Sequence, residues 1–582
     1  MRDQVPAESD ESGLTDPPET LAEAQQPRRV ATLQQRRLAW RLAMARGWFG
    51  RRRFMATRFL FVPPHLHLAD PSIAGDFLSG QIVLGGRTLL TGGRFPFDLP
   101  PPCRSFSVAL HGFEWLRHFD ASGNPEIRSG ARQLVRRWMK RREQADWPGA
   151  EDPEAVPRRL VAWITHSALI TDQADFSEYQ ALLRHLQRDA AMVRVLALQQ
   201  NIGMLALEAA IALLFHALAL DRPASALRQA ETLFESNLER DLASDGGPLD
   251  RNPATAVRLA ATLIPLLALY RARQSSPPDA LGPHLLRLIS FIRMMQHPDG
   301  GLALFNGGGL ALRDSASQVT RFGSGRVARL DSATESGFER LEDEHGIVIA
   351  DTGRRPPPGF DERATASALA FEFSTKADRL IVNCGMPAWA EGPVARSFRV
   401  GAAHSTILVD DQSFISLAPQ TSVLEGRAFG LTSNGQAGPV ERVVTPGMQY
   451  LVLRHDGLAD SLGYRVERHL TLLGGGGGLQ GLDRIIQTDG RGQNRRITLA
   501  FHLHPRILPV MLSRQDGVML RLPHQQPGRD LWLFEAPGLP LHLEESRCFD
   551  QEILNPRTEA IILDVPISGS LDIHWRLIPY QG

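Results

Sequence analysis

The pattern of apolar residues changes character once along this chain, near residues 298–318, and this change limits the possible folds more than any other feature. Before it, from about residue 106 to residue 296, apolar side chains recur at three- and four-residue steps, as at Leu110, Phe113 and Leu116. That spacing is typical of amphipathic helices. After it come short runs such as GIVIAD, RLIVNCG and ITLAFHLHP, separated by turn residues, as in antiparallel strands. The sequence therefore predicts an all-α part followed by an all-β part.

Each part has a predicted architecture. The helical runs are joined by short breaks such as DRPAS, SDGGP and SSPPD, which is typical of serial helix hairpins and predicts an (α/α) toroid-like helical domain. The regularly spaced strands predict a large antiparallel β-sandwich. A chain of 582 residues is too long for a single core, which agrees with two domains. Junctions between domains are places where ligand sites tend to lie.

We divide the chain into four segments. Residues 1–35 form an acidic, Pro-rich tail that we expect to be disordered. Residues 36–105 are a basic arm with a lead-in segment, 106–312 the helical domain, and 313–582 the β-sandwich. The tail has no apolar stretch behind a basic start, so no signal peptide is visible.

Composition restricts the class of partner. The chain has 64 basic and 64 acidic side chains, and a net charge of zero argues against a general nucleic-acid binder. No window approaches about twenty uncharged apolar residues, so we expect no membrane span. Eight arginines lie among Leu, Trp and Phe in residues 36–61. This arm could contact a membrane surface, or be a solvated helix or docking arm.

Two polar clusters fall in the helical half. Asn201 begins a strongly apolar helix, where it is either a helix cap or a functional amide. The motif DGGPLDRNP starts at Asp245 and lies between two helices. It is either a turn with a helix cap or a binding loop, because it places Arg251 beside Asn252, a good carboxylate-binding pair.

Histidines supply the candidates in the β half. His404 precedes the strand ILVD, and His455 ends another strand within RHDG. Each is either structural or functional. His502 and His504 lie on one side of a strand, but the sequence offers no third ligand for a metal.

The order of these clusters resembles the heparinase II/III family of polysaccharide lyases, from about residue 60 to the C-terminus. The motifs that carry the resemblance are RFPFDLPPP, LHGFEWLRHF, DGGPLDRNP, DGGLALFNG, AAHST, HDG, GLDRI and FHLHP. The resemblance implies an alginate-lyase-like helical domain and a heparinase II/III-like sandwich. It also implies β-elimination across a uronic acid of an acidic polysaccharide, at the cleft between the two domains.

The resemblance also implies roles for residues. Elimination requires neutralisation of the uronate carboxylate, a base near the proton and an acid near the leaving oxygen. By position, Asn201 corresponds to the carboxylate-neutralising amide and His404 to the proton-transfer histidine. Substrate contacts are implied for Arg251, Asn252, Asp245 and His455.

This sequence departs from the family pattern where the acid and base are expected. Ile202 stands where a His is common, Thr255 and Ala256 where a Tyr and a His are common, and Leu458 where a Tyr is usual. A threonine hydroxyl is a much weaker acid than a phenol. Tyr464 lies nearest the expected cleft strand and is the candidate substitute.

Three functions remain open: a lyase, a non-catalytic anionic-glycan-binding protein of the cell envelope, and a glycan hydrolase on the same scaffold, which would need two facing carboxylates. No cofactor is required for these reactions. Some relatives hold a structural divalent ion, for which His455 with Asp410 or Asp411 is the candidate site. The resemblance implies the cell envelope or periplasm, and the lack of a visible export signal leaves the cytoplasm open.

Overall fold

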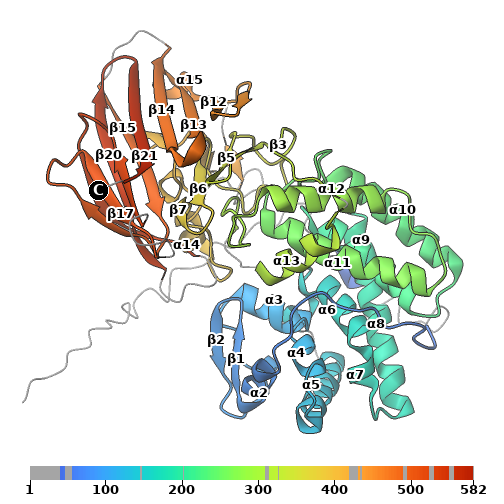
Figure 1. Cartoon of the computed structure of the whole chain (residues 1–582). Helices are drawn as coiled ribbons and strands as arrows, with labels where there is room; N and C mark the ends of the chain where they lie inside the picture. Colours follow the sequence, from blue (N-terminus) through green and yellow to red (C-terminus); the bar gives the residue numbers. More distant parts are fainter. Residues whose placement is uncertain are drawn as a thin grey trace, which may run out of the picture.

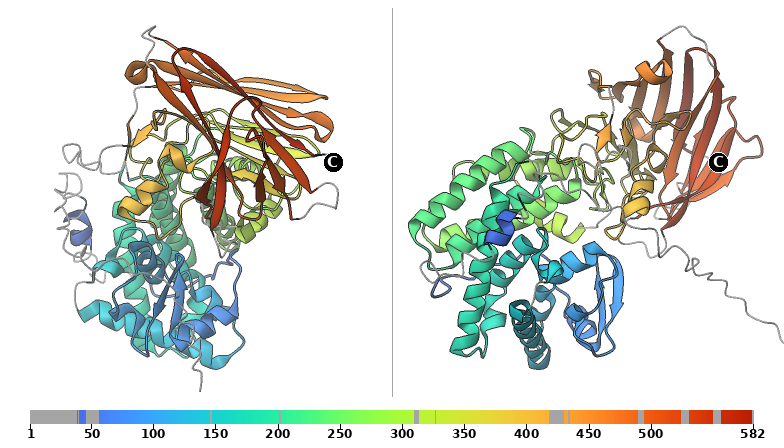
Figure 2. Two further views of the ribbon diagram at one scale, coloured as in Figure 1. Left: turned by 90° about the vertical axis from the view of Figure 1, so that its left-hand side faces the viewer. Right: turned by 180° about the vertical axis from the view of Figure 1, so that it is seen from behind.

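The helical part of the molecule lies beside the β part, and Figures 1 and 2 show the two from three sides. The computed structural model describes residues 38, 40–45, 56–144, 147–200, 202–308, 313–325, 327–417, 430–432, 435–488, 494–523, 530–549 and 556–580. The tail at 1–35 and residues 36, 37, 39 and 46–55 of the basic arm therefore lie outside the described residues. The α-then-β order predicted from the sequence is confirmed.

The helical part contains a series of α-helices and one β-hairpin. The helices are α2 (Pro71–Ser79), α3 (Arg104–Gly112), α4 (Leu116–Asp120), α5 (Pro125–Gln144), α6 (Ala155–Thr165), α7 (Ser167–Thr171), α8 (Phe176–Ala197), α9 (Leu205–Ala219), α10 (Ala224–Asp241), α11 (Pro253–Ala272), α12 (Leu281–Met294) and α13 (Arg313–Phe322). The hairpin is β1 (Gln81–Leu84) with β2 (Arg87–Leu90). Helix α13 lies after residue 312 and packs with α11 and α12.

Helix α9 is the centre of the helical part. It contacts α6, α8, α10 and α11, and nearly all of its side chains are buried, which explains why its sequence is apolar on all sides. Helix α8 begins with a capping box of Asp175 and Glu178. Helix α11 begins with Asn252 as its cap and Pro253 in its first turn.

Helix α11 is also long and apolar enough to cross a membrane by length and composition. However, 78% of its most apolar window is buried inside the protein. Its apolar side chains belong to the helical core, so packing within the fold explains its composition.

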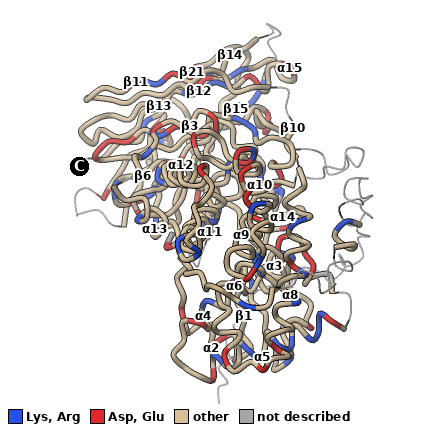
Figure 3. The backbone as a smooth tube through the Cα atoms, turned by 90° about the vertical axis from the view of Figure 1, so that its right-hand side faces the viewer, with Lys and Arg blue, Asp and Glu red and all other residues tan. Residues whose placement is uncertain are grey.

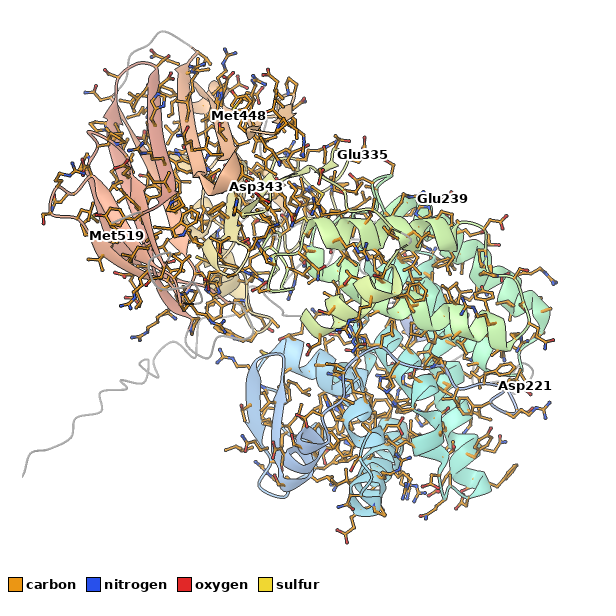
Figure 4. The ribbon with its side chains drawn as sticks, in the orientation of Figure 1. Asp221, Glu239, Glu335, Asp343, Met448 and Met519 are labelled. Atoms are coloured by element: carbon orange, nitrogen blue, oxygen red, sulfur yellow. The ribbon has the colours of Figure 1, made fainter. Side chains whose placement is uncertain are left out.

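The chain before α2 follows the helical part in an extended form. The backbone N–H of Leu60 donates to the carbonyl of Ala219 at 2.7 Å. The N–H of Thr57 donates to Asp221 at 2.7 Å, and Asp221 is labelled at the far end of the helical part in Figure 4. These bonds fix the lead-in segment to the end of α9.

The β part contains two large sheets. The first has the order β11-β12-β13-β14-β21-β18-β17-β16, and the second β19-β20-β15-β7-β6-β5-β4-β3 with β8 paired to β15. All pairings are antiparallel. The strands are β3 (Ser332–Ala333), β4 (Phe338–Glu342), β5 (Gly346–Asp351), β6 (Phe371–Thr375), β7 (Arg379–Val382), β8 (Ile407–Val409), β11 (Glu441–Thr445), β12 (Met448–Leu458), β13 (Tyr464–Leu473), β14 (Gly478–Gln487), β15 (Arg495–Leu503), β16 (Leu508–Met511), β17 (Gly517–Arg521), β18 (Leu531–Glu535), β19 (Leu541–Arg547), β20 (Arg557–Ile567) and β21 (Leu571–Pro579).

The two sheets share one hydrophobic core. The ring of Phe371 on β6 stacks on Trp575 on β21 with centroids 5.6 Å apart, and Phe501 on β15 packs against Phe534 on β18 at 4.7 Å. Strand β13 alternates buried and less buried positions, because one of its faces points into this core and the other away from it.

Strand β5 belongs to two cores at once. Ile347 and Ile349 pack into the core of the helical part, whereas Val348 and Ala350 pack into the core between the sheets. This burial on both faces explains why GIVIAD is continuously apolar and does not alternate. The helical and β parts are therefore joined by a packed apolar interface.

Candidate functional site

The loop between α10 and α11 carries the DGGPLDRNP motif and contacts the β part. Asp245 accepts hydrogen bonds from the N–H of Ser336 at 2.7 Å and from its hydroxyl at 2.6 Å. Ser336 follows Glu335, which Figure 4 labels close to where the two parts meet. The motif therefore begins by attaching the helical part to the first strands of the β part.

Arg251 attaches the same loop more firmly. It has a left-handed backbone with φ 55° and is 4% exposed. Its guanidinium lies 2.6 Å from the carboxylate of Asp351 and donates to the carbonyls of Ser336, Gly337 and Arg354. These contacts occupy all three of its nitrogens.

The neighbouring residue, Asn252, acts within its own helix. Its side chain accepts from the N–H of Ala254 at 2.9 Å and caps α11. The side chain of Asn306 donates to the carbonyl of Arg251 at 3.3 Å. Asp245 and Arg251 already have partners inside the protein, and the side-chain oxygen of Asn252 caps α11. Substrate binding by these three residues stays a prediction.

His455 lies on the other side of Asp351. A Cβ placed on Gly353 would lie 2.6 Å from its Cδ2 atom, and the N–H of Gly353 donates to Asp351. The Nδ1 atom of His455 accepts from the N–H of Gly457 at 3.0 Å. Burial lowers the pKa of His455, so its ring is neutral at pH 7. The structure thus brings Asp245, Arg251 and His455 to one junction around Asp351.

Two of the three predicted catalytic residues, His404 and Tyr464, are described, and both are buried. His404 is 1% exposed, follows the short turn η5 (Gly401–Ala403) and lies near the ring of His502. Burial, and then the neighbouring His502, lower the pKa of His404 to about 3. Tyr464 is 1% exposed in the core between the sheets. Asn201 lies outside the described residues.

Thr255 and Asp250 form a pair next to the start of α11. The hydroxyl of Thr255 donates to Asp250 at 2.7 Å, and the N–H of Asn252 donates to the same carboxyl group at 3.0 Å. Burial raises the pKa of Asp250 to about 6, against the lowering effect of these two hydrogen bonds. A hydroxyl therefore donates to a carboxyl group at the position where the family resemblance implies a tyrosine.

A cavity of about 110 Å³ lies within the helical part. Its charged lining consists of Glu114, Arg117, Arg158, Glu208 and Arg258. Its apolar lining includes Leu66, Val161, Ala162, Ile211, Phe215, Leu259 and Pro265, and three histidines complete one end: His65, His67 and His166.

One ion pair connects two helices across this cavity. Arg258 on α11 lies 3.3 Å from Glu208 on α9, and 3.4 Å from the hydroxyl of Thr255. The chain of contacts from Asp250 through Thr255 and Arg258 to Glu208 therefore reaches the cavity. These residues form the candidate functional site.

The sequence motifs described above assign no function to this lining. The sequence does contain a sign of this site, however, because Glu208 and Arg258 each interrupt an otherwise apolar helical stretch. A charged side chain on such a helix needs a partner or a polar cavity, and here the two are partners. Glu114 lies in the turn between α3 and α4, Arg117 on the short helix α4, and Arg158 beside Arg159 on α6.

The aspartates expected in a metal site lie elsewhere. Asp410 pairs with Arg495 at 2.8 Å and Asp411 with Arg496 at 2.6 Å, whereas His455 contacts the Asp351 region. Among the described residues, no group of three or more His, Cys, Asp or Glu side chains is placed to hold a metal ion. A structural divalent ion stays a prediction.

Comparison with known proteins agrees with the two-part fold. Residues 325–576 match the family model described as heparinase II/III-like, C-terminal. The chain is 28% identical over 528 residues to FtsZ-localized protein C of Caulobacter vibrioides, covering 88% of this chain and 89% of that protein.

Two crystal structures show the same fold. Heparinase III superposes with a TM-score of 0.68 at 12% identity, over 94% of this chain and 89% of that one. Heparan sulfate lyase HepC of Pedobacter heparinus, in a mutant form, gives a TM-score of 0.59 at 13% identity, over 94% and 88%. Residues 325–576 therefore match the heparinase II/III-like C-terminal family, and the chain as a whole shares the fold of these two structures.

Proposed function

We propose that this chain is a non-catalytic binding protein on the polysaccharide lyase scaffold, and that it localises with FtsZ. The observation that carries the proposal is the pair of Thr255 and Asp250. A lyase needs an acidic group at this position, and here the hydroxyl is a weak acid that already donates to the part-buried carboxyl group of Asp250.

The environment of His404 gives further support. At 1% exposure it has almost no surface that a polymer could reach. Neither His404 nor Tyr464 is among the residues that line the cavity of the helical part. Proton transfer from a polysaccharide to His404 would require the loop around it to open.

Localisation with FtsZ follows from the relative. That protein is named for its localisation with FtsZ, and the two chains match over most of the length of both. At the level of architecture, we propose that the helices close into an (α/α) toroid and that the sheets form a β-sandwich. Peripheral membrane contact through the arginine-rich arm stays a prediction.

A second candidate function is β-elimination on a uronate polysaccharide. The family model and the fold shared with heparinase III favour it. In this alternative His404 transfers the proton of the uronate, and Tyr464 assists His404 in this step. Asn201 neutralises the uronate carboxylate. Arg251, Asn252, Asp245 and His455 would contact the sugar once the two parts moved apart.

The test measures elimination directly. Purified protein and a His404→Ala variant are incubated with a panel of uronate polysaccharides while far-ultraviolet absorbance follows the new double bond. We expect flat traces for both proteins. A rise in the wild type that disappears in the variant would establish the lyase instead.

Localisation needs a separate experiment. The fluorescently tagged full-length chain is imaged beside tagged FtsZ in its native cells. We expect the two signals to coincide, and to disperse together when FtsZ is depleted. A signal that keeps its pattern after depletion would contradict localisation with FtsZ, whatever the absorbance assay gives.

A further inference from the structure

The cavity of the helical part has two chemically different walls. Val161 on α6, Ile211 and Phe215 on α9, and Leu259 on α11 form an apolar wall. Arg258 and Glu208 lie in the same lining, on two of the same helices. An elongated ligand in this cavity would therefore meet charge at one end and hydrocarbon along its body.

The charged lining favours an anion. It contains three guanidinium groups and two carboxylates. Arg117 donates to the carbonyls of Leu68 and Glu114, which are neutral groups. Burial lowers the pKa of Arg117, and the nearby carboxylate of Glu114 opposes this effect. A bound anion would further stabilise the charge of Arg117.

Arg258 has a donor suited to such an anion. Its Nε atom is buried and meets no hydrogen-bond partner among the described residues. Its contact with Glu208 is single and 3.3 Å long, through Nη2. A ligand carboxylate could pair with Nε and a terminal nitrogen together, which is the strong two-pronged arrangement that arginine makes with carboxylates.

The apolar wall selects against sugars. Each sugar hydroxyl placed against Val161, Ile211 or Phe215 would lose its water without gaining a hydrogen-bond partner, which is unfavourable. Burial of a hydrocarbon body against the same side chains is favourable. The volume of about 110 Å³ suits an aromatic ring or a short acyl chain.

We propose that this cavity binds a small amphipathic carboxylate, with its acid group on Arg258 and its hydrocarbon body against the wall of α6, α9 and α11. The site is distinct in chemistry from a polysaccharide cleft. The proposal rests on the cavity alone and holds whether or not the chain localises with FtsZ or cleaves a glycan.

The test uses isothermal titration calorimetry of the full-length protein with three probes. Octanoate carries both features, octanamide lacks the charge, and glucuronate lacks the hydrocarbon body. We expect octanoate to bind at least about tenfold more tightly than octanamide, because a carboxylate accepts two charge-assisted hydrogen bonds from Arg258 whereas the amide offers one neutral acceptor oxygen. We expect glucuronate to bind more weakly than either.

Two variants locate the site. Arg258→Gln should reduce octanoate affinity by about tenfold or more and leave octanamide unchanged. Val161→Thr changes the wall with little change in volume and should weaken octanoate and octanamide equally. Arg194→Gln alters an exposed arginine on α8 and is the matched control. Circular dichroism checks that each variant is folded.

Four results would overturn the proposal. The first three are equal affinity for octanoate and octanamide, unchanged octanoate binding in both cavity variants, and tighter binding of glucuronate than of octanoate. The third would identify a hydrophilic sugar site in the same place. Absence of octanoate binding at millimolar concentration would equally reject it. None of these results depends on the absorbance or imaging experiments.

Discussion

Asp250 is the residue whose ionisation most directly affects the stability of the candidate site. Its pKa is raised by burial to about 6 in the folded protein, against an ordinary value of 3.8. Between about pH 4 and pH 6 the folded chain therefore holds a proton that the unfolded chain has lost. Stability must fall as pH rises through this window, because the folded state binds more protons there.

The corresponding variant is Asp250→Asn, which cannot ionise. We expect wild type to lose stability relative to this variant between pH 4.5 and pH 7.0, as the buried carboxyl group gives up its proton. Urea unfolding of both proteins at the two pH values measures the difference. A difference that stays constant, or that moves in favour of wild type at pH 7.0, would show that the group ionises normally in the fold.

Among the connections between helices, the loop before α11 can adopt its conformation only with a glycine at position 246. Gly246 has φ 92°, and a Cβ there would lie 2.4 Å from the carbonyl of Arg287 on α12. We expect Gly246→Ala to destabilise the protein by about 2–4 kcal/mol, from the left-handed backbone and the clash with the helix. Guanidinium unfolding followed at the helical circular dichroism band measures this.

Gly282 provides the matched control for that change. It lies in α12, and an added Cβ would meet nothing within 4 Å. Gly282→Ala should leave stability unchanged or raise it by up to about 1 kcal/mol, because alanine is the better helix former. If both variants lost similar amounts of stability, the cause would be the sensitivity of α12 to substitution. It would not be the close approach of the loop to α12.

The order of elements could be predicted from the sequence because helix and strand patterns are local. Runs such as GIVIAD and the apolar stretch of α9 are readable within about ten residues. The partners of the candidate residues are not local. Arg251 pairs with Asp351, which is 100 positions later, and neither residue type nor spacing identifies that partner.

The same limit applies to the cavity. Glu208 and Arg258 are separated by 50 positions and meet only because α9 and α11 pack together. Their unusual place on apolar helices was visible in the sequence, whereas Val161 and Phe215 look like any other core residues. Recognising a cavity wall requires knowing which core positions lack neighbours, and this depends on the packing of several helices.

At the scale of the whole molecule, charge does not separate the two parts. Figure 3 shows basic and acidic residues interspersed over both, in agreement with the net charge of zero. The parts are joined instead by specific buried contacts. Besides Arg251 with Asp351, His297 pairs with Glu372 at 2.8 Å and Asp299 with Arg379 at 3.0 Å.

These contacts and the shared strand β5 should make the protein unfold as one unit. If one part unfolded, the other would lose the partners of several charged groups. The face of β5 that carries Ile347 would also lose its apolar contacts with the helical part. We therefore expect a single calorimetric transition, with equal calorimetric and van't Hoff enthalpies. The double variant Arg251→Gln/Arg379→Gln removes two of the three pairs and should separate this transition into two.

The control for the double variant is Arg484→Gln, which removes an exposed ion pair with Asp572 inside the β part. Exposed pairs contribute about 0–1 kcal/mol, so this variant should keep the single transition at nearly the same temperature. Two resolved transitions in the wild type would mean that the helical and β parts fold independently. The buried pairs would then orient the two parts without coupling their stability.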